Sequence, residues 1–352
     1  MLRIIKPPQR DVDLAVLSVI KDEMFFLPSF LEHYRAVGVT QFIFLDDRST
    51  DGSLEYLMEQ PDCAVMEADA TFGQVVDGKN RAVIVWRTAL ARQFSMNKWA
   101  LVVDLDEFLE LPPGYANLPA LIAELDRHGH SAVGAIMIDF YPADISHLFD
   151  ATRPSTKGKL FAQYPYFDDC YHGQWVGGRF KRAYSGATER LFQRYGLTLA
   201  SQRTSAHHTT VVGLTKSFLE RLGVRERKFE LEIKKVPLVR WNAEREYVTS
   251  HSLNVPPGDG LQLPLVHFKF SGHIFEKVRS AVTSGAYSMN SAKYRVLELL
   301  LAKMMDDNGT FLCKHSHRYS DSSDFLRSGI MRIDGLKSRS NLLTRSAGGG
   351  TV

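Results

Sequence analysis

The chain has 352 residues, with 43 Lys and Arg against 40 Asp and Glu, a formal net charge of +3 and three cysteines. Its length is enough for one large or two modest domains with a sizeable core. The small charge argues against a dedicated nucleic-acid binder, and three widely spaced cysteines exclude a disulfide framework and favour a reducing, cytoplasmic compartment. We find no signal peptide and no apolar run near the ~20 residues of a membrane helix.

From Asp13 to about Phe140, short β-rich runs alternate with amphipathic helical stretches. This alternation is typical of a parallel sheet with crossover helices. We expect strands at residues 14–20, 41–46, 63–67, 99–106 and 131–140. We expect helices at residues 26–38, 53–60, 76–94 and 118–129. The sequence therefore predicts an α/β fold with a mostly parallel sheet.

The chain beyond residue 140 is more irregular. Residues 141–185 are rich in Tyr, Gly, Pro and Asp without a sustained period, which predicts long surface loops. A strand is expected at 263–270, and helices at 274–282 and 291–305. We therefore divide the chain into a binding part at 1–140, a mixed part ending in helices at 141–330, and a disordered basic tail at 331–352.

Three of the predicted strands end in acidic residues. The carboxylates are Asp22 and Glu23 after the first strand, Asp46 and Asp47 at the second, and Asp104, Asp106 and Glu107 at the fourth. Ligands of an open parallel sheet bind outside the carboxyl ends of its strands. Like charges gathered there are unfavourable unless something positive lies among them, and a divalent cation is the simplest candidate.

Asp104 and Asp106 are two residues apart, so in extended chain both would project to one side and Leu105 to the other. Two carboxylates with open positions for water or phosphate suit Mg²⁺ or Mn²⁺. A diphosphate would be the matching anion. The alternative is structural, because Asp and Ser after a strand, as in STDGS at 49–53, are ordinary helix caps.

The motifs KDE, FLPSFLEHYRAVGVTQFIFLDDRSTDGS and WALVVDLDEF resemble the family 2-like bacterial glycosyltransferases, whose nucleotide-sugar-binding fold is called GT-A. With GATERLF, KVPLVRW, SHSL and LVHFKF, the resemblance covers roughly residues 12 to 300. It implies an enzyme dependent on Mn²⁺ or Mg²⁺ that moves a sugar from a nucleotide-sugar donor, a UDP- or GDP-sugar, to a glycan, lipid-linked or other hydroxyl acceptor. Inversion at the sugar carbon is the expected outcome.

The resemblance also implies roles for individual residues. Asp46 or Asp47 would contact the nucleoside, and Lys79 and Arg81 in DGKNRA would contact phosphate. Within the DxD motif, Asp104 would face the ribose and the metal. Asp22 and Glu23 belong with these donor-binding residues because they follow the first strand of the same edge. An exposed basic helix face is the alternative for Lys79 and Arg81.

Metal binding and catalysis are assigned in the same way. Asp106 would ligate the metal directly, and His267 in LVHFKF would be a third ligand beside Asp104, unless it is hydrogen-bonded in the core. A carboxylate base would take the proton from the acceptor hydroxyl. Glu189 in GATERLF is the first choice for this base, with an ion pair to a nearby Arg as the alternative. Asp168 and Asp169 are the next choices.

Other functions remain open at this stage. VVDLDEFLEL also resembles the motif of haloacid-dehalogenase-type phosphatases, in which the first Asp is a nucleophile, although those enzymes carry it on their first strand. A nucleotide- or glycan-binding module without catalysis would need the same front part. Cys313, His315 and His317 could share a face but lack a fourth metal ligand. The basic tail could contact an anionic membrane weakly, and the oligomeric state is open.

Overall fold

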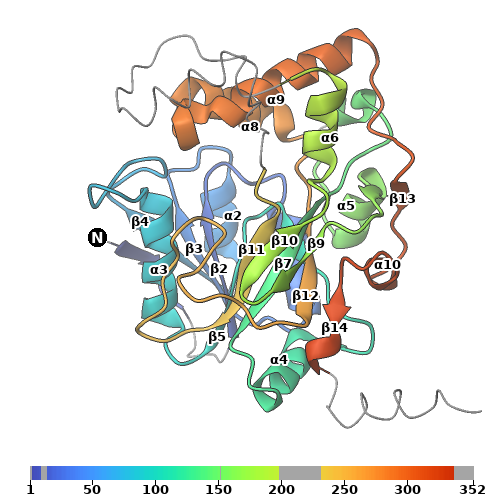
Figure 1. Ribbon diagram of the computed structural model, residues 1–352. Helices are drawn as coiled ribbons and strands as arrows, with labels where there is room; N and C mark the ends of the chain where they lie inside the picture. Colours follow the sequence, from blue (N-terminus) through green and yellow to red (C-terminus); the bar gives the residue numbers. More distant parts are fainter. Residues whose placement is uncertain (1, 9–13, 151, 198–230, 337–352) are drawn as a thin grey trace, which may run out of the picture.

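The computed structural model describes residues 2–8, 14–150, 152–197 and 231–336. Its centre is a 10-stranded sheet in the order β1-β4-β3-β2-β5-β11-β7-β12-β14, with β6 paired to β12 (Figure 1). The sheet strands are β1 (Leu2–Lys6), β2 (Leu14–Ile20), β3 (Phe42–Asp46), β4 (Cys63–Ala68), β5 (Trp99–Val102), β6 (Glu107–Leu109), β7 (Ala132–Asp139), β11 (Lys234–Arg240), β12 (Leu261–His267) and β14 (Arg332–Ile333). Two small sheets pair β8 (Tyr166–Asp168) with β13 (Ser316–Arg318) and β9 (Gly173–Val176) with β10 (Arg179–Arg182).

Helices surround this sheet, with α8 and α9 across one end and α4 near the opposite end (Figure 1). The helices are α1 (Leu27–Ala36), α2 (Ser53–Glu59), α3 (Ala82–Phe94), α4 (Leu118–Arg127), α5 (Lys157–Gln163), α6 (Ala187–Arg194), α8 (Ile274–Ser284), α9 (Ser288–Asp306) and α10 (Ser323–Arg327), with 3-10 turns η1 (Ile145–Phe149) and η3 (Asp334–Leu336). The prediction of an α/β fold is confirmed. The strands β2, β3, β4, β5, β7 and β12 run in one direction, whereas β1, β6, β11 and β14 run antiparallel to their neighbours.

The strand order reverses at the centre of the sheet. The chain runs from β2 through α1 to β3 and through α2 to β4, and all three strands are parallel neighbours. It then returns through α3 to β5, which pairs with the other side of β2, again in parallel. In open α/β sheets, ligands bind outside the carboxyl ends of the strands at such a reversal. The space beyond β2 and β5 is therefore the expected ligand position.

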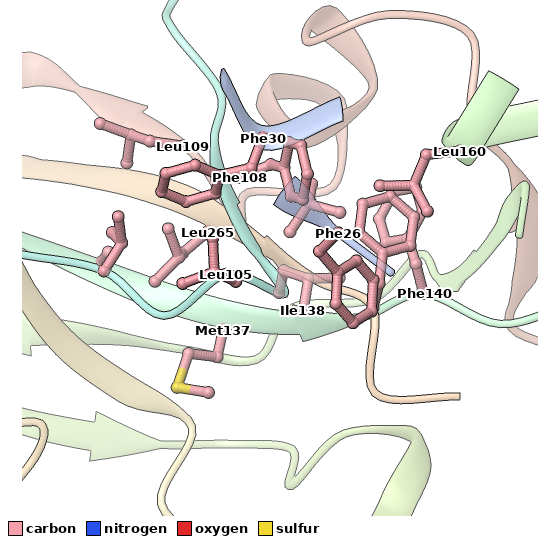
Figure 2. Packing of buried hydrophobic residues seen from close by; sticks show 14 of the residues in the cluster. Phe26, Phe30, Leu105, Phe108, Leu109, Met137, Ile138, Phe140, Leu160 and Leu265 are labelled. Carbon is pink, nitrogen blue, oxygen red and sulfur yellow. The ribbon is translucent and has the colours of Figure 1, made fainter. Parts of the chain in front are cut away.

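Aromatic packing holds the acidic segment after β5 in place. Phe108 is fully buried, with its ring centroid 6.1 Å from that of Phe30 and 5.3 Å from that of Phe268. Figure 2 shows Leu105 and Phe108 within this cluster. Burial of two apolar side chains fixes the backbone between them, since a shift would expose both to water.

The prediction of one strand over residues 99–106 was wrong. β5 ends at Val102, and a turn closed by the Glu107 amide donating to the Asp104 carbonyl (3.0 Å) separates it from β6. β6 leaves β5 and pairs with β12 instead. Because the chain changes partners at this turn, Asp104 and Asp106 do not share one side of an extended strand.

Residues 141–185 were also predicted wrongly as long loops. They contain η1, α5 and the short strands β8, β9 and β10, which are too brief to show a period in the sequence. The helix predicted from residue 76 begins at Ala82. Strand β11 and helix α6 were not predicted, and β11 and β12 lie in the same sheet as β2 to β7.

The tail assigned to residues 331–352 begins within the fold, because β14 pairs with β12. The remainder of that tail, residues 337–352, lies outside the described residues. Among the described residues, no helix combines the length and apolar character needed to cross a bilayer.

The buried Tyr34 hydroxyl ties α1 to the segment after the acidic turn. It donates to the Glu107 carbonyl (3.0 Å) and accepts from the Leu109 amide (3.0 Å). We expect Tyr34→Phe to lower the free energy of unfolding by about 1–3 kcal/mol, because it leaves two buried backbone groups unpaired. Urea unfolding measures this, with the exposed Tyr171 as control. Equal stability of Tyr34→Phe and Tyr171→Phe would contradict the expectation.

Candidate active site

The reversal point of the sheet collects charged side chains from five elements. Glu23 follows β2, Asp106 follows β5, Asp139 ends β7, His267 ends β12, and Lys277 lies on α8. The carboxyl ends of β2, β5, β7 and β12 thus converge under α8, as expected for strands that run in one direction.

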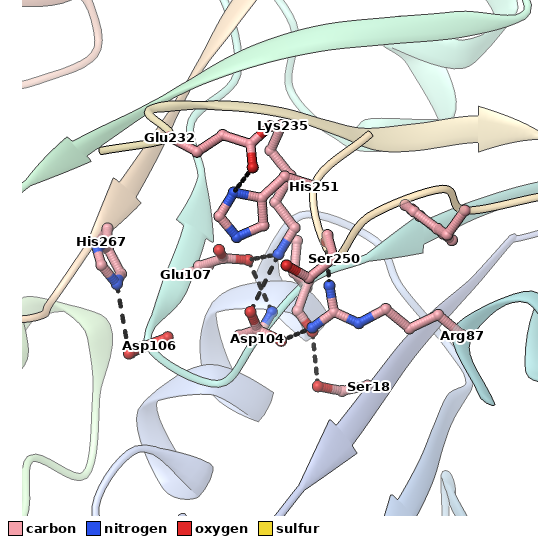
Figure 3. Close-up of polar contacts among 12 residues, drawn as sticks. Ser18, Arg87, Asp104, Asp106, Glu107, Glu232, Lys235, Ser250, His251 and His267 are labelled. Carbon is pink, nitrogen blue, oxygen red and sulfur yellow. Dashed lines mark hydrogen bonds and ion pairs between the residues drawn. The ribbon is translucent and has the colours of Figure 1, made fainter. Parts of the chain in front are cut away.

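Asp106 and His267 face each other in this cluster. The His267 ring points at the Asp106 carboxylate (Figure 3), with Nε2 3.6 Å from Asp106 Oδ2, and its Nδ1 donates to Asp139 Oδ1 at 2.8 Å. Asp139 Oδ2 in turn accepts from the Thr188 amide (3.2 Å) and hydroxyl (2.5 Å). Burial disfavours the imidazolium, but the two carboxylates outweigh it and raise the pKa of His267 to about 9. Asp139 therefore fixes the orientation of the ring and leaves Nε2 directed at Asp106.

Lys277 also binds this acidic group. Its ammonium lies 3.0 Å from Asp106 Oδ2 and 3.2 Å from Glu23 Oε1. Burial raises the pKa of Glu23 to about 7, although Lys277 acts in the opposite direction. Lys277 thus bridges the strand ends β2 and β5 and ties them to α8.

Asp104 points away from this group toward two other cations (Figure 3). One carboxylate oxygen pairs with Arg87 of α3, and the other is 3.3 Å from the Lys235 ammonium of β11. Lys235 is fully buried and also pairs with buried Glu107. Partial desolvation raises the pKa of the half-buried Asp104, but Arg87 and Lys235 outweigh it and lower that pKa to about 2.

The structure corrects the reasoning that the acidic clusters need a metal for their charge. Arg87, Lys235 and Lys277 already supply positive charge among the carboxylates. A metal is therefore not needed to neutralise the carboxylates. The only support for a metal site is the arrangement of Asp106 and His267. A nucleophilic role for Asp104, as in the phosphatase alternative, is disfavoured because both of its oxygens are ion-paired.

The carboxylates on the β2–β3 side hold backbone amides. Asp22 Oδ1 accepts from the Thr50 amide (2.6 Å), Asp46 Oδ2 from the Ser49 amide (3.1 Å) and Asp47 Oδ2 from the Phe72 amide (2.8 Å). These bonds shape the loops beside the reversal point. The buried Oδ1 of Asp46 has no hydrogen-bond partner within the described chain. A nucleoside contact by Asp46 or Asp47 stays a prediction.

The two predicted phosphate-binding residues differ in environment. Lys79 lies exposed in the loop before α3. Arg81 is half-buried and donates to the Ala286 carbonyl, which ties this loop to the connection between α8 and α9. Their binding of phosphate stays a prediction.

The three candidate bases also differ. Asp168 is buried and accepts from Tyr141 (2.5 Å), Tyr184 (2.8 Å) and the Arg190 guanidinium (3.0 and 3.1 Å), so neither oxygen is available to take a proton. Asp169 is half-buried, with Oδ2 3.8 Å from His317 Nδ1.

Glu189 is buried in the first turn of α6, next to the Thr188 that binds Asp139. Its Oε1 accepts from Gln193 at 3.4 Å, and its Oε2 has no hydrogen-bond partner among the residues described. Among the described residues, Glu189 forms no ion pair with an Arg, and its neighbour Arg190 pairs with Asp168. Among the described residues, Asp169 Oδ1 also lacks a hydrogen-bond partner, and Glu189 differs from Asp169 in following Thr188, which binds Asp139.

Asp106 and His267 stay the candidate metal ligands, although Lys277 already lies 3.0 Å from the Asp106 Oδ2 atom that faces His267. Within the described residues, no group of three or more His, Cys, Asp or Glu could hold a metal, and the Cys313, His315 and His317 set forms none. Mg²⁺ and Mn²⁺ sites often combine one or two protein ligands with water and substrate phosphate. A histidine whose other nitrogen is bound to a carboxylate, as His267 is to Asp139, is a common metal ligand.

Sequence reasoning missed Arg87, Lys235, Lys277 and Asp139. Each basic residue has a signal in retrospect: Arg87 and Lys277 interrupt apolar faces of α3 and α8, and Lys235 lies in an apolar strand. A charged residue at a buried position is rarely tolerated unless it is paired. Asp139 ends a predicted strand and could have been grouped with the other strand-end carboxylates.

We expect Asp139→Asn to lower the pKa of His267, since it removes one of the two carboxylates that raise it to about 9. A raised pKa in the folded state stabilises the fold fully below pH about 6.5, and this contribution disappears as pH rises through about 9. The wild-type protein should therefore lose its stability advantage over Asp139→Asn across that interval.

NMR titration of the His267 ring and urea unfolding at each pH, both with chelator present, measure this. Asp150→Asn, at a fully exposed carboxylate, is the control. An unchanged His267 titration in Asp139→Asn would contradict the assignment of Asp139 as its partner.

Similarity to known proteins is weak, so the functional conclusion rests on the geometry of the site. No family model and no curated protein matches this chain. Among solved structures, the chain is similar to the mannosyltransferase PcManGT from Pyrobaculum calidifontis in complex with GDP-Man and Mn²⁺. The identity is 12%, the match covers 99% of this chain and 79% of that chain, and the TM-score is 0.28. A similarity this weak supports no argument about fold or function.

Proposed function

We propose that this protein is a glycosyltransferase that uses a nucleotide-sugar donor and a divalent cation. The observation that carries the proposal is the pairing of Asp106 with His267 at the reversal point of the sheet, with His267 oriented by Asp139. A ligand site of this kind suits a phosphorylated nucleotide, because the strand ends of an α/β sheet are where nucleotides bind. The motifs that resemble family 2-like glycosyltransferases include both Asp106 and His267.

Asp106 and His267 would hold Mn²⁺ or Mg²⁺, and the bound cation would offset negative charge on the departing nucleoside diphosphate. Asp139 keeps Nε2 of His267 available by occupying Nδ1. We assign Asp104 to a positioning role, since Arg87 and Lys235 occupy both of its oxygens. Asp46, whose buried Oδ1 has no hydrogen-bond partner among the described residues, is the candidate for the nucleoside contact.

Glu189 is the proposed general base. Its Oε2, a buried atom without a hydrogen-bond partner among the described residues, would accept the proton of the acceptor hydroxyl while that oxygen attacks the anomeric carbon and the bond to the diphosphate breaks. Attack from the side opposite the leaving group inverts configuration at that carbon. Most of the acceleration would come from positioning the two substrates and from stabilising the charge of the leaving group.

The test is a screen of purified protein against UDP-, GDP-, CMP- and dTDP-sugars with and without Mn²⁺. Thermal stabilisation and donor hydrolysis are both recorded, and Asp106→Asn is compared with the exposed control Asp150→Asn. We expect one nucleotide class to stabilise the protein in a metal-dependent way that Asp106→Asn removes. No response to any nucleotide would refute the proposal, and binding without hydrolysis or transfer would favour a non-catalytic binding module.

A further inference from the structure

Helix α6, which carries the proposed base Glu189, is anchored through two arginines on one face. Arg190 and Arg194 are four residues apart, so their side chains leave the helix on the same side. Arg190 donates to the Phe311 carbonyl at 3.0 Å, and Arg194 donates to the Thr310 carbonyl at 3.1 Å. A helix of 8 residues has little stability of its own, so such contacts decide how α6 is rotated about its axis.

The Arg190 guanidinium also forms a bidentate ion pair with Asp168 of β8. Its Nη2 lies 3.0 Å from Asp168 Oδ1, and its Nε lies 3.1 Å from Oδ2. The side chain of Asp168 is 1% exposed and that of Arg190 is 15% exposed, so the pair is largely shielded from water. Two parallel N–H···O contacts fix the orientation of both groups as well as their separation. Asp168 therefore constrains the direction in which Arg190 leaves α6.

Two tyrosines hold Asp168 in turn. Tyr141, two residues after β7, donates to Oδ1 at 2.5 Å, and Tyr184 donates to Oδ2 at 2.8 Å. Each oxygen of Asp168 thus accepts from one tyrosine and from Arg190. A buried ion pair contributes little net stability over apolar packing, because desolvation offsets the attraction between the charges. What four donors around one carboxylate supply is a fixed geometry.

Glu189 lies between two residues that are both held in this way. Thr188 donates its amide and its hydroxyl to Asp139 Oδ2, at 3.2 and 2.5 Å. On the other side, Arg190 is held by Asp168. Successive side chains of a helix point roughly 100° apart, so fixing the residues before and after Glu189 also fixes the direction of its own side chain.

We propose that Asp168 is a positioning residue for Glu189 and acts through Arg190. The role of Glu189 as the base rests on the proposed function, whereas the hold of Asp168 on α6 does not depend on it. The sequence presented Asp168 and Glu189 as alternative bases, and their contacts give them different tasks. Asp168 orients the helix, and Glu189 takes the proton. Proton transfer requires hydrogen-bond distance to the acceptor hydroxyl, so a rotated α6 would slow transfer without weakening donor binding.

The test compares Asp168→Asn and Arg190→Lys with wild type by hydrogen exchange and steady-state kinetics. Both variants break the bidentate contact, and Arg190→Lys keeps the positive charge, so it remains informative if Asp168→Asn does not fold. We expect the amides of α6 to exchange more than about tenfold faster in both variants. The kcat for transfer should fall about 10–100-fold, while the donor KM stays within about threefold of wild type.

Asp324→Asn is the matched control. The Asp324 side chain is also 1% exposed, but it pairs with Arg327 of α10 and not with α6. This variant should leave α6 exchange and kcat unchanged. In a Glu189→Gln background, Asp168→Asn should lower kcat by no more than about a further twofold, because the base through which it acts is absent.

Unchanged α6 exchange in both Asp168→Asn and Arg190→Lys would overturn the proposal. Additive losses of kcat in the double variant with Glu189→Gln would do the same, as would equal effects of Asp324→Asn. If α6 exchange rises in the variants but the wild-type protein transfers no sugar, the glycosyltransferase proposal fails together with the role of Glu189. The hold of Asp168 on α6 would then stand, so the two failures are distinguishable.

Discussion

Asp106→Asn is expected to lower Mn²⁺ affinity more than about a hundredfold and to remove measurable donor turnover. The change keeps the shape of the side chain but removes its charge, so Nε2 of His267 loses its carboxylate neighbour at 3.6 Å. Loss of an outer partner of a metal ligand already costs about 10–100-fold in affinity, and Asp106 would be a direct ligand. Isothermal titration with Mn²⁺ and a donor-hydrolysis assay measure the two effects.

Asp104→Asn is the matched comparison, because it makes the same chemical change two residues earlier. Asp104 pairs with Arg87 and Lys235, so this variant should lose stability while keeping Mn²⁺ affinity within a few-fold of wild type. Equal loss of metal affinity in both variants would restore Asp104 as a ligand. Unchanged affinity in Asp106→Asn would remove the metal site.

Lys235→Met is expected to lower the free energy of unfolding by about 3–5 kcal/mol, since it leaves a buried carboxylate without its cation. The Lys235 side chain is 0% exposed and that of Glu107 is 1% exposed. Urea or guanidinium unfolding measures the change. The double variant Lys235→Met with Glu107→Gln should recover much of the loss, because it no longer buries an uncompensated charge.

Lys234→Met is the control for this effect. Lys234 precedes Lys235 on β11, but its ammonium is half-exposed and lies 3.9 Å from Glu232. Ion pairs of that kind contribute about 0–1 kcal/mol. A loss of similar size in both variants would show that the strand, rather than the buried pair, is sensitive to substitution.

The sequence predicted where the site lies better than it predicted the ion pairs within the site. Acidic residues at the ends of β2, β3 and β5 were expected at one edge, and the parallel order of these strands places them there. His267 was expected near Asp106 from the resemblance, and the two side chains face each other. The pairing of Asp104 with Lys235 could not be predicted, because β11 lies 131 residues away in sequence. The pairing with Arg87, 17 residues away, depends on how α3 packs against the sheet.

The catalytic base could likewise not be identified from the sequence. Glu189, Asp168 and Asp169 are similar carboxylates in sequence, and nothing local separates them. Arg190 and two tyrosines occupy Asp168, while Glu189 and Asp169 each keep one buried oxygen without a hydrogen-bond partner among the described residues. Whether a carboxylate can act as a base depends on which donors tertiary packing brings to it.

By itself, the sequence determined the alternation of apolar strands and amphipathic helices up to residue 140, because periodicity and caps are local properties of the chain. It also determined that carboxylates would meet beyond β2 and β5. Only the tertiary structure decided where β5 ends, because β6 turns away to pair with β12. It also decided which cation neutralises each carboxylate, since contact between residues more than a hundred positions apart depends on packing and not on spacing.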